Sequence, residues 1–321
     1  MFRIFLLSLL LSRVGMHLSA QEAPNLNPPK SPPIKDVSSK IYDEDVKSDP
    51  DKDKSYNLLH PAPKSGLRDI GDLTGQTPIT LDAGHFLIDV DVLNFGLDNS
   101  TLDSVRERSF EIAPFSFKLG LLDKLDATFS FSPYSIEKYK NGRPNQRLPN
   151  GVFKKNDPFK FTDKGFGDIE FSLKYNLWGN DDGDTAFAVA PFLKIPTNQG
   201  GLDNKYFEGG VLLPFTADLP KDWSLDFTTG LEIRHDIEGS GYHAELSNSL
   251  GFSHPITSKL DGSVNFNSLA TTDRKEKWKG SVGLGLTYEI TRNLLFSSDV
   301  DFGVSKAAQD FTASAGFAFR F

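Results

Sequence analysis

The sequence contains no cysteine. Disulfide bonds therefore cannot stabilise the fold, and no lipid can be attached to a cysteine near the N-terminus. No apolar run reaches the roughly 20 residues that a transmembrane helix needs. The chain also lacks an excess of positive charge, because its 43 acidic residues outnumber its 35 lysines and arginines and give a formal net charge of −8 at pH 7. This acidic balance argues against nucleic acid as a partner, since phosphate backbones attract basic surfaces.

The N-terminal part of the chain has two segments that differ in composition from the rest. Residues 1–20 combine a basic residue, Arg3, with the short apolar run Ile4–Leu11 and a small residue, Ala20, and this pattern predicts a secretory signal peptide. Residues 21–67 are rich in proline, aspartate and lysine, so we expect a disordered arm that cannot bury enough apolar surface to fold. The arm is either a spacer or a contact for a partner.

The strongest pattern is the alternation of side chains after residue 68, and it is clearest at the chain end. In Phe311–Phe321, phenylalanine and alanine occupy one face and small or polar side chains occupy the other. An aromatic strand at an open edge would promote aggregation, whereas a closed barrel pairs it on both sides. Twelve alternating segments can be counted in this region. Residues 68–321 are therefore predicted to form an all-β transmembrane antiparallel barrel of about twelve strands.

The connections between these segments alternate in length, which predicts the orientation. Those after even-numbered strands are short, whereas the connection after the third strand, residues 132–164, is the longest and carries many lysines and arginines. Bacterial barrels have short periplasmic turns and longer extracellular loops. We therefore expect a periplasmic arm and an extracellular long loop. A secreted β-sandwich also alternates, but the polar second face and the loop asymmetry favour the outer membrane of a Gram-negative-type bacterium.

Two features resemble known proteins. The terminal phenylalanines Phe317, Phe319 and Phe321 resemble the C-terminal signature of bacterial outer-membrane barrels, which implies recognition by the barrel-assembly machinery. A second resemblance is to the outer-membrane transporter family named for the meta-pathway of phenol degradation. The motifs that carry it are Gly165–Asp168, Leu173–Tyr175, Lys194–Thr197 and Gly209–Val211. This resemblance implies an outer-membrane barrel transporter that is often associated with aromatic or other hydrophobic compounds.

The polar faces of the strands would line the lumen, so their charged residues form the candidate site. The pore-lining residues expected from this parity are Asp89, Asp91, Asp168, Glu170, Lys174, Lys194, Glu232, Arg234, Asp299 and Asp301. A twelve-stranded barrel has a backbone radius of roughly 12 Å. Inward side chains therefore either fill the lumen with cross-strand ion pairs or leave a narrow, cation-preferring passage.

We expect an outer-membrane channel or transporter for small solutes, with membrane lipid and a small-molecule cargo as partners and no nucleic acid. A structural or adhesion barrel with a plugged lumen is one alternative. A rim hydrolase is another, because His235, Asp236, Ser240 and His243 can supply a base and a nucleophile. No glycine-framed serine, phosphate loop or ligand-like histidine spacing accompanies them, so we expect no enzyme, no cofactor and no metal.

Overall fold

The computed structural model describes residues 56–63, 77–99, 105–141, 160–180, 183–198, 205–236, 241–274 and 276–321. These residues form one sheet whose strands are β1 (Phe86–Asp98), β2 (Val105–Ile112), β3 (Phe115–Leu122), β4 (Leu125–Phe131), β5 (Tyr134–Asn141), β6 (Lys160–Gly165), β7 (Ile169–Trp178), β8 (Thr185–Ile195), β9 (Glu208–Leu219), β10 (Trp223–His235), β11 (Tyr242–Thr257), β12 (Leu260–Thr271), β13 (Lys279–Thr291), β14 (Leu294–Gly303) and β15 (Phe311–Arg320). No helix in this part of the chain is long and apolar enough to cross a membrane. The expected signal peptide, residues 1–20, lies outside the described residues, as do residues 21–55 and 64–67 of the expected arm.

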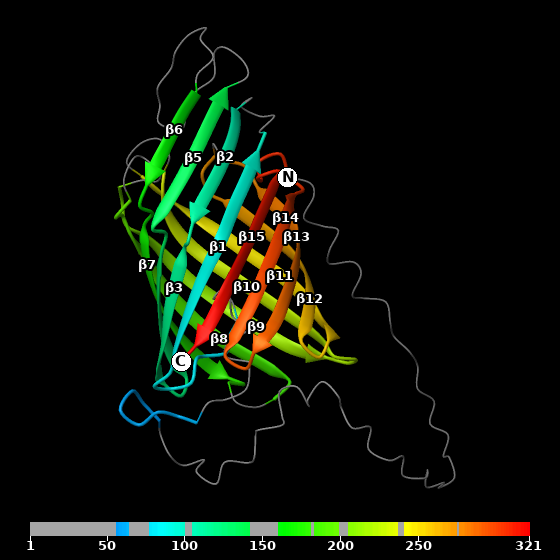
Figure 1. Cartoon of the computed structure of the whole chain (residues 1–321). Coiled ribbons are helices and arrows are strands. Elements are labelled where there is room, and N and C mark those ends of the chain that lie inside the picture. Colours follow the sequence, from blue (N-terminus) through cyan, green and yellow to red (C-terminus); the bar gives the residue numbers. More distant parts are fainter. Residues whose placement is uncertain are drawn as a thin grey trace, which may run out of the picture. The chain divides into compact units, whose positions relative to one another are not determined.

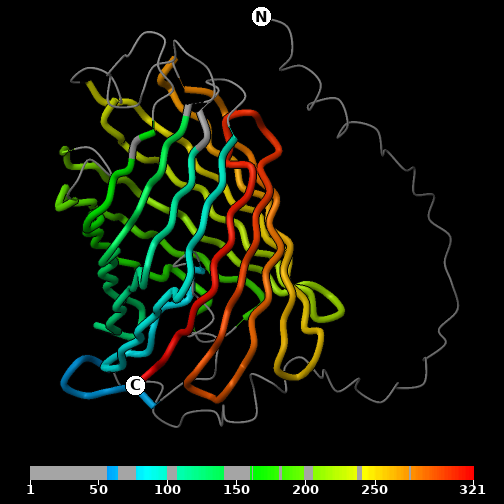
Figure 2. Tube along the Cα trace, turned by 45° about the horizontal axis from the view of Figure 1, so that its top comes forward, coloured from blue at the N-terminus to red at the C-terminus, as the bar shows by residue number. Residues whose placement is uncertain are grey.

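The sheet closes on itself because its first strand pairs with its last. β15 is hydrogen-bonded to β14 on one side and to β1 on the other, and Figure 1 shows the red β15 beside the cyan β1. Figure 2 shows the same two strands adjacent from a second direction. The main-chain N–H of Phe321 adds a further bond to the Phe86 carbonyl (2.9 Å). The predicted closed antiparallel barrel is confirmed, with its edges removed by pairing.

Three positions in the barrel wall are each filled by two strands in succession. β2 continues as β3, β4 as β5, and β6 as β7, with interruptions at residues 113–114, 132–133 and 166–168. Counting each of these as one interrupted strand gives twelve, as predicted. The interruptions lie side by side, because β1, β2, β5 and β6 pair above them while β1, β3, β4 and β7 pair below them. Ala113 adopts a positive φ of 52° there, and Pro114 lacks a main-chain donor.

The predicted loop of residues 132–164 is wrong in extent. Its two ends are strands, β5 and β6, which pair with each other, and β5 also pairs with β2. The wall position that follows this loop is likewise interrupted, because β6 ends at Gly165 and β7 begins only at Ile169. Among the described residues β6 pairs with β5 alone, so the sheet carries no hydrogen bonds between β6 and β8 above this point.

The two faces of each strand meet different surroundings, as the alternation requires. On β7 the outward residues Phe171 and Tyr175 are 42% and 46% exposed, whereas the inward Lys174 and Asn176 are buried.

The end of the barrel with the C-terminus is called the turn end here, because its five connections are short; the opposite end is called the loop end. Trp178 and the other two tryptophans lie exposed near these two ends, as interfacial aromatics do.

Candidate functional site

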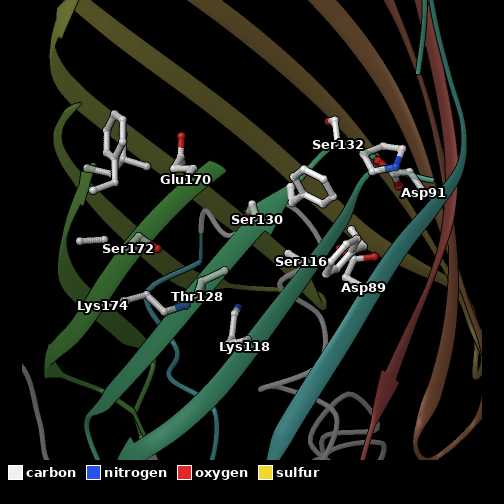
Figure 3. Close-up of a pocket in the computed structure, with 16 residues that line it drawn as sticks. Asp89, Asp91, Ser116, Lys118, Thr128, Ser130, Ser132, Glu170, Ser172 and Lys174 are labelled. Atoms are coloured by element: carbon white, nitrogen blue, oxygen red, sulfur yellow. The ribbon is translucent and has the colours of Figure 1, made fainter. Parts of the chain in front are cut away.

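A cavity of about 250 Å³ opens among the inward-facing side chains of β1, β3, β4 and β7 (Figure 3). Four of the residues predicted to line the lumen border it: Asp89 and Asp91 from β1, and Glu170 and Lys174 from β7. Lys118 and several serines and threonines complete the polar part of the lining. The cavity therefore presents carboxylates from two strands and ammonium groups between them.

The remainder of the cavity lining is apolar and lies partly at the interruption in the wall. Pro114, Phe115 and Phe131 border it there, while Phe192 and Leu212 border it from β8 and β9. Phe115 and Phe131 belong to the outward faces of β3 and β4, yet the interruption brings them to the cavity. At the interruption, residues of the outer face thus border the interior.

An aromatic series leads from the cavity to the outside of the barrel. Phe115 contacts Phe131 edge to face, with ring centroids 5.7 Å apart, and Phe131 stacks on Phe166 at 6.1 Å. Phe166 is 45% exposed. The main-chain N–H of Gly167 donates to the Ser132 carbonyl (2.9 Å), which is the hydrogen bond that bridges the interruption here. Aromatic side chains therefore connect the lumen to the outer surface across the wall.

Residues 77–83, called the plug segment from here on, cross the lumen at the turn end. The main-chain N–H of Leu81 donates to Asp126 Oδ2 of β4 (3.0 Å). Lys174 Nζ and Asn176 Nδ2 of β7 donate to main-chain carbonyls of the segment (3.0 and 2.9 Å). One side of the plug segment is therefore hydrogen-bonded to the polar inner face of β4 and β7.

The plug segment also packs against β1, β14 and β15 through the side chain of Leu81. Leu81 has no exposed surface and clusters with the buried side chains of Leu87 on β1, Leu295 on β14 and Ala318 on β15. These strands lie well around the barrel from β7 in the sheet order. The segment therefore contacts six consecutive strands of the wall at the turn end, from β7 to β14, which the sequence did not indicate because the inserted residues precede the first alternating strand.

The plug segment approaches β3 so closely that only glycine fits. A Cβ at Gly120 would lie 2.0 Å from the main-chain oxygen of Asp82, which is far inside van der Waals contact. Gly120 also donates its N–H to the His85 carbonyl and accepts from Gly84, at 3.0 and 2.9 Å. The contact between the plug segment and β3 therefore requires glycine at position 120.

Residues 56–63, within the predicted disordered arm, pack beneath the plug segment. The N–H of Ala62 donates to the Ala83 carbonyl (2.9 Å), and the N–H of Tyr56 lies 3.3 Å from the Asp123 carboxylate. His85 bridges this stretch to the chain end, with Nε2 2.8 Å from the Ala62 carbonyl and Nδ1 3.0 Å from Phe321 O. The end of the arm is therefore attached to the turn end.

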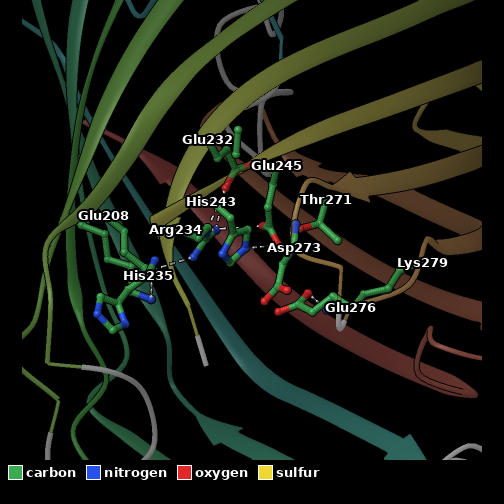
Figure 4. A network of polar contacts seen from close by, with 12 residues as sticks. Glu208, Glu232, Arg234, His235, His243, Glu245, Thr271, Asp273, Glu276 and Lys279 are labelled. Atoms are coloured by element: carbon green, nitrogen blue, oxygen red, sulfur yellow. Dashed lines mark hydrogen bonds and ion pairs between the residues drawn. The ribbon is translucent and has the colours of Figure 1, made fainter. Parts of the chain in front are cut away.

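A second polar cluster lies at the loop end, and four of the predicted lumen residues belong to it. Its members are Asp168, Lys194, Glu208, Glu232, Arg234 and Glu245. Lys194 Nζ lies 3.4 Å from Asp168 Oδ2 and 3.0 Å from Glu208 Oε2. Arg234 continues the cluster, with Nη1 3.1 Å from Glu208 Oε2 and Nη2 2.6 Å from Glu232 Oε2 (Figure 4). Inward charges here are therefore compensated by cross-strand pairs.

The last two predicted residues, Asp299 and Asp301, border neither the cavity nor this cluster. Both extend from β14 across β13, where a Cβ at Gly285 or Gly283 would lie 2.4 Å from a carboxylate oxygen. Asp301 Oδ2 also accepts from Thr312 Oγ1 (3.4 Å). The structure thus divides the predicted set into a cavity, a salt-bridge cluster and a separate acidic pair.

Of the residues proposed for a rim hydrolase, the two histidines have different partners in the part of the chain that the structure describes. His235 stacks on Tyr206, with ring centroids 3.6 Å apart. His243 follows Tyr242, the strand partner of His235, and its Nδ1 lies 2.9 Å from Asp236 Oδ1. Ser240 lies outside the described residues. His243 is instead surrounded by carboxylates from separate segments, a grouping that chain spacing did not reveal.

Comparison with known proteins identifies relatives of this barrel. The family model described as "Putative MetA-pathway of phenol degradation" matches residues 125–321. An outer membrane channel from Pseudomonas putida F1 is similar over 74% of this chain and 95% of its own, with 10% identity and a TM-score of 0.50. The NanC porin is similar over 72% of this chain and 98% of its own, with 10% identity and a TM-score of 0.45. No curated protein sequence matches the chain. At this level of identity the structural likeness concerns the fold.

Proposed function

The chain belongs to the family of the MetA-pathway of phenol degradation, whose model spans more than half of it, and from this premise we propose that it is an outer-membrane channel for small hydrophobic or aromatic solutes. Solute enters from the loop end, occupies the cavity bordered by Glu170 and Phe115, and leaves sideways through the interrupted wall. The barrel acts by binding and passage and not by catalysis.

The observation that carries this proposal is the pairing of a filled turn end with a cavity that reaches the interruption. The plug segment is hydrogen-bonded to β4 and β7 and packs against β1, β14 and β15, so it narrows the exit at the turn end. The cavity is bordered by Pro114 and Phe131 at the interruption. A solute in the cavity therefore lies beside the wall rather than above an open exit.

The chemistry of the cavity fits a solute with an apolar body. Phe115, Phe131, Phe192 and Leu212 provide apolar contact, and a cavity of this volume accommodates a small aromatic ring system. A solute that passes between lipid and the lumen must desolvate, and phenylalanine side chains along the route lower that cost.

A disulfide across the interruption tests the lateral route. The natural chain has no cysteine, so a pair introduced as Ser132→Cys and Gly167→Cys forms one defined bond. A Cβ at Gly167 would lie 2.9 Å from Ser132 Cβ, and disulfides need about 3.5–4.5 Å, so a small separation of the two strands suffices. Cells carrying the oxidised pair should take up radiolabelled naphthalene no faster than cells without the barrel, and reductant should restore uptake.

The matched control places the same bond elsewhere in the wall. Ser224 and Ser253 face each other on β10 and β11, far from the interruption in the sheet order. Ser224→Cys with Ser253→Cys should leave uptake unchanged in both redox states. Equal uptake by the oxidised and reduced Ser132/Gly167 variant would overturn the lateral route.

A further inference from the structure

The strongest unassigned feature is the environment of His243 at the loop end. This residue is the second of β11, and its side chain is buried. Nδ1 lies 2.9 Å from Asp236 Oδ1, and Nε2 lies 3.4 Å from Glu245 Oε1. Two further carboxylates, those of Asp273 and Glu276, come from the connection between β12 and β13 (Figure 4). One imidazole therefore meets carboxylates from three separate segments.

Both ring nitrogens of His243 face oxygen acceptors, which sets a requirement for a cation. A neutral imidazole donates from one nitrogen and carries a lone pair on the other. A lone pair on a ring nitrogen that faces a carboxylate oxygen is repelled by it, so a cation must lie between the two atoms. That cation is either a proton on the ring or a metal ion bound to the ring nitrogen and the carboxylate together.

We propose that His243, Asp236 and Asp273 form a binding site for a divalent transition metal of the zinc type. Each of the three places one ligand atom within 4.8 Å of the others. Nδ1 of His243 is the ligand atom, because Nε2 is engaged with Glu245. Metal-binding histidines characteristically donate their other ring N–H to a carboxylate, which holds the ring in place.

The remaining contacts favour Nδ1 over Nε2 as the metal-binding nitrogen. Glu245 Oε2 lies 3.7 Å from Arg234 Nε, and Glu276 Oε2 lies 3.5 Å from Lys279 Nζ. The two carboxylates of the Nε2 side therefore already have basic partners. Glu245, held by Arg234, then acts as a positioning residue for the His243 ring.

The donor set selects the metal. One imidazole nitrogen and two carboxylate oxygens suit Zn²⁺, with bonds of about 2.0–2.2 Å and an open position for water. Such bonds place tetrahedral ligand atoms about 3.3 Å apart, so the 2.9 Å contact between His243 and Asp236 opens by only a few tenths of an ångström. Ca²⁺ takes six to eight oxygen ligands, and an imidazole is a poor member of that set.

A metal at this place connects two neighbouring hairpins at the loop end. Asp236 and His243 flank the connection between β10 and β11, while Asp273 belongs to the connection between β12 and β13. The pairing of β11 with β12 ends beside the site, where the Thr272 N–H donates to the Ala244 carbonyl (2.9 Å), and a bond from one ion to both connections extends this link by one residue. The ion therefore acts as a clamp on the rim, outside the cavity and the interrupted wall.

The test measures zinc binding by the purified full-length barrel in detergent micelles. After dialysis against a chelating resin, the protein is titrated with Zn²⁺ and the bound metal is counted by mass spectrometry. We expect one Zn²⁺ per chain, with binding lost in His243→Gln and in Asp236→Asn. Glu245→Gln should lower the affinity by about 10–100-fold, the usual effect of losing a supporting carboxylate. Heat-modifiable migration on a gel shows that each variant is folded.

The matched control is His254→Gln, at the other end of the same strand, where the ring lies 4.8 Å from the Trp223 ring centroid. This variant should bind Zn²⁺ as the natural chain does. Zinc binding that survives in folded His243→Gln, or equal competition by Ca²⁺ at the same concentration, would overturn the proposal. Binding that is lost in Glu276→Gln and kept in Asp273→Asn would overturn the assignment to Nδ1. An X-ray absorption spectrum without an imidazole nitrogen among the zinc ligands would overturn the proposal as a whole, because His243 would then not bind the metal.

Discussion

Release of the plug segment by a single substitution, Leu81→Ala, is the most direct test of how the turn end is closed. Leu81 has no exposed surface and packs with Leu87, Leu295 and Ala318 from three strands. Its main-chain bond to Asp126 does not depend on the side chain and would persist. The substitution therefore removes apolar packing while it leaves the hydrogen-bonded barrel intact.

The expected magnitude follows from the burial of this side chain. Leucine-to-alanine substitutions at fully buried sites cost about 2–5 kcal/mol. Each 1.4 kcal/mol is a factor of ten in an equilibrium constant, so docking of the plug segment should weaken by about 30-fold at the lower bound. The hydrogen bonds from Lys174 and Asn176 offset part of the ordering cost of the segment. A loss of this size should make undocking visible.

Two measurements report the undocked state. Single-channel recording in planar bilayers should give a larger time-averaged conductance for Leu81→Ala than for the natural chain. The second measurement uses Thr80→Cys, which introduces a thiol at a buried position into a chain without cysteine. A membrane-impermeant maleimide should label this thiol slowly in the parent and much faster when Leu81→Ala is also present.

The control is Leu93→Ala on β1, where the leucine is 39% exposed. That substitution should change neither conductance nor labelling of Thr80→Cys. If Leu81→Ala leaves both readouts at the parental values, the plug segment does not close the turn end through the packing of Leu81, and the reasoning for a lateral route loses its basis.

Two further predictions concern the two faces of the barrel wall. Phe319→Ser combined with Phe321→Ser removes outward aromatics, including the stack of Phe321 on Phe86, and should abolish outer-membrane accumulation in cell fractions; normal amounts of heat-modifiable barrel would contradict the assembly signal. Phe171→Lys should destabilise the barrel by about 2–4 kcal/mol near the membrane midplane, while the neighbouring inward Ser172→Lys should cost much less. Urea unfolding from lipid measures both, and equal losses would mean that the assigned faces are wrong.

The closed barrel was predictable because strand faces in a membrane differ in every second residue. On β7 and β15 the alternation predicted from the sequence matches the exposed and buried faces, down to the buried Lys174 beside the exposed Tyr175. The pairing of β15 with β1 also follows, because an aromatic terminal strand needs partners on both edges.

The strands β5 and β6 escaped sequence analysis for a physical reason. Tyr134–Asn141 and Lys160–Gly165 carry polar side chains on both faces, so they lack the apolar stripe that marks a strand in lipid. They form because β2 offers an unpaired edge that β5 extends, and β5 in turn offers one to β6. Backbone pairing at a distance, not local pattern, decides these two strands.

The candidate site was also predictable from the sequence only in part. Alternation alone assigned Asp89, Glu170 and Lys174 to inward faces, and these residues do border one cavity. It did not divide the acidic and basic residues into a cavity and a separate salt-bridge cluster around Arg234. That division depends on strand stagger and on the interruption of the wall, neither of which a period of two encodes.

The sequence by itself determined the class of fold, the closure of the sheet and the inward and outward faces of the alternating strands, because alternation and turn length are local properties. Only the tertiary structure decided how the turn end is filled and what surrounds His243. The bond from Thr80 to Asn180 joins residues 100 apart, and the one from Leu81 to Asp126 joins residues 45 apart. Such contacts depend on how far each strand is shifted against its neighbours around the barrel, and no stretch of chain carries that information alone.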